Sequence, residues 1–392
     1  MQPQDLFVTP VTGAEAFYPY ITPLHLRLAL LWYLSLQESG FTLAPCGVQR
    51  RTYGEKMAGG RVSVVAESKP LFHMMYRITP MNDIKRILLV LDSEKQQQFL
   101  LDQVAALARG ADAQVTLLAT AGELQVPLTV AMEAIELEEL VTKHHTEQLE
   151  SAAAILEKAG VRTAIKVAYG KPFMAIIREV IQNGFDIVVK AAEGQEGARR
   201  ILFGGTDMQL LRMCPCPVWI VKPGSTDGIR SIMTAVDLVP HDEEKNRLAT
   251  KILHWGGRLA ALTGAKLHVL HAWQIYGEAT MRRRMAPVAV LDKLAQDEQR
   301  RHRQLLEEAL AKAGLDEKTV EIHFHKDDAR ELIPAVANKS QIDLLLMGTI
   351  GRTGIPGFFI GNTAESVLHA VNCSILAIKP DGFVSPVKLD DD

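Results

Sequence analysis

The chain has 392 residues, 47% of them hydrophobic and 23% charged, which is ordinary composition for two or three globular domains with sizeable cores. The 43 basic and 46 acidic side chains nearly cancel to a net charge of −3, which excludes an overall basic surface for nucleic acid or for an anionic membrane. Four cysteines are too few for a disulfide framework, and no apolar run reaches the ~20 residues of a membrane span. We therefore expect a cytoplasmic protein with no membrane segment and no nucleic-acid partner.

The N-terminal segment, residues 1–80, shows no alternation of strand and helix patterns. Met81 stands directly before the first strand pattern, where a domain would naturally begin. We expect the native product to start at Met81, so that residues 1–80 are a mis-assigned start. A genuine N-terminal extension is the alternative, and N-terminal sequencing of the endogenous protein distinguishes the two.

The rest of the chain is a tandem repeat. Residues Ile84–Asp92 match Ile229–Asp237 at an offset of 145, and Cys216–Pro223 match Cys373–Pro380 at an offset of 157. Between these ends the order of matching segments is kept and the offset only increases, as small insertions in one of two copies of a fold would produce. The predicted domains are residues 84–222, residues 229–380 and an acidic C-terminal tail at 381–392.

Each copy predicts five strands alternating with four helices. The short apolar runs at 84–91 and 232–236 are typical of strands buried on both faces. In copy two, an apolar stripe from Leu248 to Leu262 predicts a helix, and Gly264 is placed to end it. The later elements of copy two are a strand at 320–324, a helix from 332, a strand at 344–347, a helix at 364–371 and a strand at 375–378. This alternation implies an α/β fold, in which each copy is a five-stranded parallel sheet with helices on both faces.

A glycine-rich segment leaves the fourth strand of copy two and enters the last helix. Three glycines follow the spacing G-x2-G-x9-G: Gly348, Gly351 and Gly361. The backbone N–H groups of such a loop, with the positive end of the following helix, can bind phosphate. Alternatively, the glycines only permit a tight turn, and Asn362 with Glu365 forms a helix cap. The residues alone leave both interpretations open.

Copy one serves as an internal control for this loop. At the offset of 157, the first glycine becomes Ala191 and the cation Arg352 becomes Gln195, while Glu193 and Glu196 add negative charge. Two carboxylates would repel a triphosphate. We therefore expect the nucleotide site in copy two and a degenerate loop in copy one.

These motifs resemble the universal stress protein family, and most closely its tandem-domain E type. The resemblance covers both repeats, and it implies a Rossmann-like nucleotide-binding fold. It also implies that adenine and ribose are held at the end of the first strand and phosphates by the loop. The nucleotide-binding residues so implied are Ala235, Val236, Asp237, Met347, Gly348, Gly351, Arg352, Gly361, Asn362 and Thr363. Asn362 stands where nucleotide binders of the family usually have Ser or Thr.

The resemblance implies a stress-response protein, including resistance to DNA damage, that binds ATP or a related nucleotide in copy two. No nucleophile or base is identified, so we expect no dedicated catalysis beyond slow ATP hydrolysis. The alternative is a nucleotide-independent interaction scaffold, with another small ligand or protein partners. Asn362 and the eroded loop of copy one favour that alternative.

Family members commonly pair through their last strand. The resemblance therefore implies that Val218–Val221 pairs with Ile375–Ile378 as an internal pseudo-dimer, and a homodimer of chains stays open. No metal site is identified from the sequence: His323 and His325 share one face of a strand, but no carboxylate or thiolate clearly completes a site.

Overall fold

The computed structural model describes residues 84–92, 97–122, 131–193, 203–222, 228–350 and 360–389. All of these residues belong to one unit of the chain, which spans Phe72–Asp392. The expectations for residues 1–80 and for Met81 lie outside the described residues. Among the helices that are described, none is long and apolar enough to cross a membrane.

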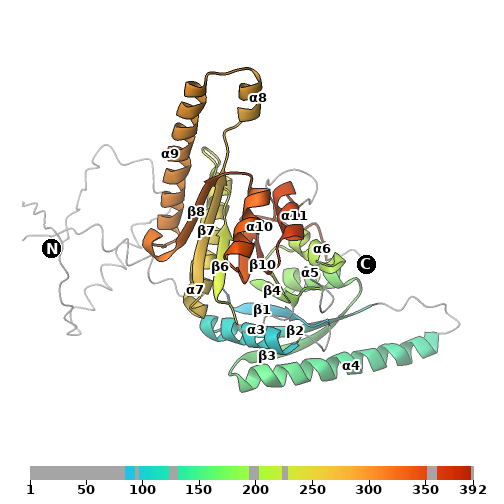
Figure 1. Cartoon of the computed structure of the whole chain (residues 1–392). Helices are drawn as coiled ribbons and strands as arrows, with labels where there is room; N and C mark the ends of the chain where they lie inside the picture. The colour runs from blue at the N-terminus through green and yellow to red at the C-terminus, as the bar shows by residue number, and fades with distance from the viewer. Residues whose placement is uncertain are drawn as a thin grey trace, which may run out of the picture. The chain divides into compact units, whose positions relative to one another are not determined.

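Both copies follow the predicted alternation of strands and helices (Figure 1). The elements of copy one are β1 (Arg86–Val90), α3 (Gln97–Ala111), β2 (Gln114–Ala121), α4 (Ala131–Lys158), β3 (Arg162–Tyr169), α5 (Pro172–Asn183), β4 (Ile187–Ala191), α6 (Gly205–Met213) and β5 (Val218–Val221). The elements of copy two are β6 (Ser231–Ala235), α7 (Glu243–Thr263), β7 (Lys266–Trp273), α8 (Glu278–Arg283), α9 (Val288–Lys312), the 3-10 turn η3 (Glu317–Thr319), β8 (Glu321–Lys326), α10 (Ala329–Lys339), β9 (Leu344–Gly348), α11 (Asn362–Ala370) and β10 (Ser374–Ile378). The short helix α8 and the turn η3 were not predicted.

The strands of both copies form one ten-stranded sheet, in the order β3-β2-β1-β4-β5-β10-β9-β6-β7-β8. Within each copy all neighbouring strands are parallel. The two halves meet where β5 and β10 pair antiparallel, with Ile375 opposite Ile220 and Leu376 opposite Trp219. The predicted pairing of the last strands is therefore confirmed, and it joins the two half-sheets into a continuous internal pseudo-dimer.

Helices cover both faces of the sheet, as predicted. Helices α3, α4, α7 and α9 contribute side chains to the core on one face, and α5, α6, α10 and α11 to the core on the other. Strand β1 illustrates why the central strands read as continuous apolar runs: Ile87 and Leu89 face the first core, and Leu88 and Val90 face the second. Each such buried side chain contributes about 1.5–3 kcal/mol to folding.

The ends of α7 follow from its sequence. Asp242 precedes the helix, and its carboxylate accepts a hydrogen bond from the backbone N–H of Lys245 at 3.1 Å, which satisfies a donor of the first turn. Gly264 ends the helix with a φ of 70°, a left-handed conformation that glycine adopts without strain. The predicted C-terminal cap at Gly264 is thus confirmed.

Candidate functional site

The carboxyl ends of β6 and β9 lie side by side in copy two, because these strands are parallel neighbours with Ala235 opposite Met347. The backbone after β6 passes through the buried Val236 to Asp237. The Asp237 side chain is 68% exposed, and its Oδ2 lies 2.7 Å from the Lys245 ammonium. The structure therefore brings the implied adenine and ribose residues beside the start of the glycine loop.

The base of the glycine loop is firmly anchored. Thr349, directly after Gly348, is buried and donates its hydroxyl to the carbonyl of Leu211 at 2.9 Å. The Lys379 ammonium donates to the Thr349 hydroxyl at 2.6 Å. The backbone N–H of Gly361 then donates to the Thr349 carbonyl at 3.0 Å and closes the loop. The predicted phosphate residues Gly351 and Arg352, in contrast, lie outside the described residues.

Gly348 packs closely against helix α7. An added Cβ at this position would lie 3.0 Å from Cδ2 of Leu248 in α7, closer than ordinary van der Waals contact. The glycine therefore allows α7 to approach the end of β9. The copy-one equivalent, Ala191, shows that the constraint belongs to copy two alone.

Helix α11 begins at the loop's end, and its first turn corrects one expectation. The N-cap residue is Gly361, which has extended backbone angles and makes no side-chain cap hydrogen bond. Asn362 is already the first helical residue, so it does not cap the helix with Glu365. Asn362 and Thr363 are exposed. The first-turn N–H groups of a helix carry partial positive charge, so this end suits an anion.

A buried histidine pair, missed in the sequence, supports the end of β6 from behind. The imidazole of His271 donates from Nδ1 to the Val236 carbonyl at 3.1 Å, and its Nε2 lies 2.9 Å from Nδ1 of His302 in α9. Burial lowers the pKa of His271 to about 4 and also lowers the pKa of His302. Both rings are therefore neutral near pH 7; His271 holds the Val236 backbone, and His302 holds the His271 ring.

In copy one, a buried ionic cluster lies at the position that corresponds to the start of the glycine loop in copy two. Lys190 is 1% exposed, and its ammonium lies 2.7 Å from Asp92, 3.1 Å from Asp207 and 3.5 Å from Glu193. Burial opposes the charge of Lys190, but the carboxylates of Asp207 and Asp92 outweigh that effect and raise its pKa. Burial raises the pKa of Asp207, although the Lys190 ammonium opposes the shift.

Asp207 also occupies the start of helix α6. Its Oδ2 accepts the backbone N–H of Glu193 at 3.0 Å and that of Gly204 at 3.1 Å. The Glu193 side chain lies so close over Gly204 that an added Cβ there would overlap its carboxylate. The effect of Glu193 is therefore not that of a free repelling charge: its carboxylate contacts Lys190. Glu196 lies outside the described residues.

The two copies differ at the positions that make this cluster. At the offset of 157, Lys190 corresponds to Met347 and Asp207 to Ala364. Copy two therefore has neither the buried ammonium nor the carboxylate that occupies the start of α6.

A second group of polar side chains lies at the opposite ends of the copy-two strands. His323 does not form a pair with His325, the combination considered from the sequence; instead it lies beside Glu321 and His268. Burial lowers the pKa of both His268 and His323, and the neighbouring Lys266 lowers the pKa of Glu321. His268 was missed because it belongs to another strand, 55 residues earlier.

Comparison with known proteins identifies the family to which this fold belongs. The model of the universal stress protein family matches residues 83–222 and 229–379. The chain belongs to the universal stress protein family. It is thus a stress-related protein with two tandem copies of the family's domain, and the resemblance seen in its motifs is confirmed.

Relatives and solved structures agree with this assignment. Universal stress protein E of Escherichia coli K12 is 33% identical over 262 residues, which are 64% of this chain and 79% of that protein. Universal stress protein E of Photorhabdus laumondii is 30% identical over 63% of this chain and 79% of its own length. A functionally unknown protein from Pseudomonas aeruginosa PAO1 superposes with a TM-score of 0.58 at 24% identity, over 77% of this chain and 94% of its own. A universal stress protein from Archaeoglobus fulgidus gives 0.52 at 18% identity, over 76% and 98%. These structures share the fold.

Proposed function

We propose that the protein acts in stress survival by binding ATP or a related nucleotide in copy two. The site is the edge formed by the ends of β6 and β9 and the start of α11. One observation carries the proposal: in copy one the Asp207 carboxylate accepts the backbone N–H groups of Glu193 and Gly204 and pairs with Lys190. Copy two has Ala364 and Met347 at the positions of Asp207 and Lys190, so it lacks this ion pair beside the start of its last helix. The glycine spacing retained in copy two supports it.

The roles of the site residues follow the family resemblance. Ala235 and Val236 hold the adenine, with the Val236 backbone fixed by His271. Asp237 binds the ribose; in the unliganded protein its carboxylate is paired with Lys245. The phosphates are bound by the loop and the first turn of α11, through Met347, Gly348, Gly351, Arg352, Gly361, Asn362 and Thr363.

The proposal includes no dedicated catalysis. Within the described part of the site, the carboxylate of Asp237 is paired with Lys245, and the histidines lie behind the backbone as buried neutral groups. None of these groups is an available general base. The protein binds nucleotide as a signal or ligand, at most with slow hydrolysis.

Calorimetric titration of ATP into the full chain tests the proposal. We expect a dissociation constant near micromolar, about −8 kcal/mol. The double variant Met347→Lys/Ala364→Asp transplants the copy-one pair, so we expect at least a hundredfold loss of affinity in a protein that stays folded by circular dichroism. Gly361→Val, which blocks the first turn sterically, should show the same loss.

Two results would count against the proposal. If the folded wild-type chain shows neither heat nor a thermal shift at millimolar ATP, the protein is better understood as an interaction scaffold. If ATP binds equally well to both variants, the nucleotide lies elsewhere than at the start of α11.

We place this function in the cytoplasm and in survival of stress that damages DNA, as the family resemblance implies. A deletion strain should lose viability under such stress and recover with the wild-type gene. Recovery with Gly361→Val to the same extent would separate the physiological role from nucleotide binding.

A further inference from the structure

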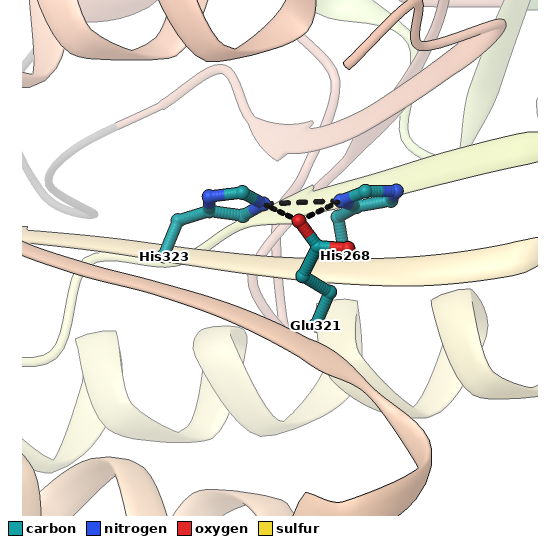
Figure 2. A group of neighbouring side chains, drawn as sticks. All are labelled: His268, Glu321 and His323. Carbon is teal, nitrogen blue, oxygen red and sulfur yellow. Dashed lines mark hydrogen bonds and ion pairs between the residues drawn. The ribbon is translucent and has the colours of Figure 1, made fainter.

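Three metal-ligating side chains converge at the amino ends of β7 and β8 (Figure 2). His268 lies directly opposite Glu321 in the parallel register, and His323 follows Glu321 by two residues. Side chains at i and i+2 of a strand share a face, so all three project from the same side of the sheet. Strand β8 is the edge of the sheet, which leaves this side partly open to solvent.

The ligand atoms are spaced as a metal ion requires. Nδ1 of His268 lies 3.0 Å from Nε2 of His323, and Oε1 of Glu321 lies 3.8 Å from the first and 3.6 Å from the second. A triangle with these edges has its centre about 2.0 Å from each corner, which is the bond length of Zn²⁺ to histidine nitrogen and carboxylate oxygen.

We propose that His268, Glu321 and His323 form a binding site for a divalent transition-metal ion, with Zn²⁺ as the expected occupant. Two imidazoles and one carboxylate are a donor set that Zn²⁺ accepts readily. Ca²⁺ and Mg²⁺ require a shell of oxygen ligands, which this group does not offer. Three protein ligands leave a fourth position of a tetrahedral ion for water.

Burial and a neighbouring lysine position the three ligand side chains. The His268 side chain is 4% exposed and His323 is 15% exposed, whereas Glu321 is 42% exposed and gives access from solvent. Lys266 forms an ion pair with Oε2 of Glu321 and leaves Oε1 directed at the imidazoles. Such contacts to the outer oxygen orient a metal-binding carboxylate.

The competing explanation is a simple hydrogen bond between two neutral imidazoles. Nδ1 of His268 and Nε2 of His323 face each other within hydrogen-bonding distance, so one N–H donates to the other nitrogen. Metal binding replaces this shared proton and turns the rings modestly about χ2, a torsion with a broad minimum. The hydrogen bond thus describes the metal-free state of the same site.

The site is separate from the proposed nucleotide edge. It lies at the amino ends of the strands, roughly 17 Å along β7 from the carboxyl end at Trp273, at about 3.3 Å per residue. A metal ion here would link the edge strand β8 to β7. We expect it to stabilise that edge whether or not nucleotide binds in copy two.

The test is Zn²⁺ titration of the untagged, metal-free full chain in competition with a chromophoric chelator. We expect one Zn²⁺ per chain in the wild type. His323→Ala should weaken binding at least tenfold, and Glu321→Gln should do so while preserving side-chain shape. His325→Ala is the matched control, because His325 is an exposed histidine on the same strand face, and it should leave affinity unchanged.

A second readout reports the ligand geometry. Co²⁺ in place of Zn²⁺ should give the visible absorption of a tetrahedral site in the wild type and in His325→Ala, but not in His323→Ala. The proposal is overturned if the wild type binds no stoichiometric Zn²⁺, or if His323→Ala and Glu321→Gln bind it as tightly as the wild type. In either case the three side chains form only a structural hydrogen-bonded group.

Discussion

Removing the Asp207 carboxylate should destabilise the protein strongly. Asp207→Ala would leave the Lys190 ammonium, which is 1% exposed, without its buried partner. Breaking a buried ion pair from one side costs about 3–5 kcal/mol, because the remaining charge is neither solvated nor paired. Asp92 and Glu193 still contact Lys190, so we expect about 3 kcal/mol, the lower end of this range.

The repeat itself supplies the control variant. Lys190→Met together with Asp207→Ala installs the residues that copy two has at these positions, Met347 and Ala364. The double variant buries no unpaired ammonium, and replacing a buried ion pair by apolar residues is often nearly neutral. We therefore expect the double variant to recover at least 2 kcal/mol relative to Asp207→Ala. The loss that remains reflects the two backbone N–H groups that Asp207 accepts.

Urea unfolding of the full chain, followed by circular dichroism, measures these differences, with comparable slopes required across the three proteins. A cost of less than about 1 kcal/mol for Asp207→Ala would refute this expectation, since the ion pair would then contribute no more than an exposed one. A double variant as unstable as Asp207→Ala would refute it as well. In that case the carboxylate would act only through the backbone of α6.

Two further changes give separate tests. Burial lowers the pKa of Lys379 from 10.5 to about 7 in the folded protein. Between pH 7 and pH 10 the unfolded chain therefore binds more protons at this residue than the folded chain does. The free energy of unfolding of the wild type, relative to Lys379→Met, should therefore rise with pH from 7 to 10, by at most about 1.4 kcal/mol per unit; a difference that stays flat in urea titrations would contradict it. Gly264→Ala forces a left-handed backbone on a residue with a Cβ, where φ is 70°. It should cost about 1 kcal/mol in the same assay, whereas Gly205→Ala within α6 should cost nothing.

The architecture could be predicted from the sequence because it depends on local signals. Continuous apolar runs marked strands buried on both faces, and the stripe from Leu248 to Leu262 marked α7. The constant order of the repeat then required the same topology twice. The antiparallel pairing of β5 with β10 is not local, and it was available only through the family resemblance.

The groups of side chains at the sites could not be predicted from the sequence in the same way. Lys190 and Asp207 are 17 residues apart, His271 and His302 are 31 apart, and His268 and His323 are 55 apart. Sequence spacing carries no signal at such separations, because the partners lie on different strands or helices. The alternative in which Asn362 caps α11 fails for a local reason: Gly361 precedes it with an extended backbone and takes the N-cap position without any side chain.

Hydrogen bonds connect the two copies near the loop positions at which their sequences differ. Lys222 and Lys379 are repeat equivalents, and each contacts the other copy across the β5–β10 junction. Lys222 donates to the carbonyl of Asn372, and Lys379 donates to the carbonyl of Leu211 in α6. Lys379 also donates to Thr349 at the base of the copy-two loop, whereas the copy-one equivalent of Thr349 is Ala192, which has no hydroxyl.

Helix α6 thereby connects the two sites. Asp207 in its first turn holds the ionic cluster of copy one, and one turn later the Leu211 carbonyl accepts from both Thr349 and Lys379. A rigid first turn of α6 therefore also fixes the anchor of the copy-two loop. In this arrangement helix α6 of copy one supports the base of the copy-two loop.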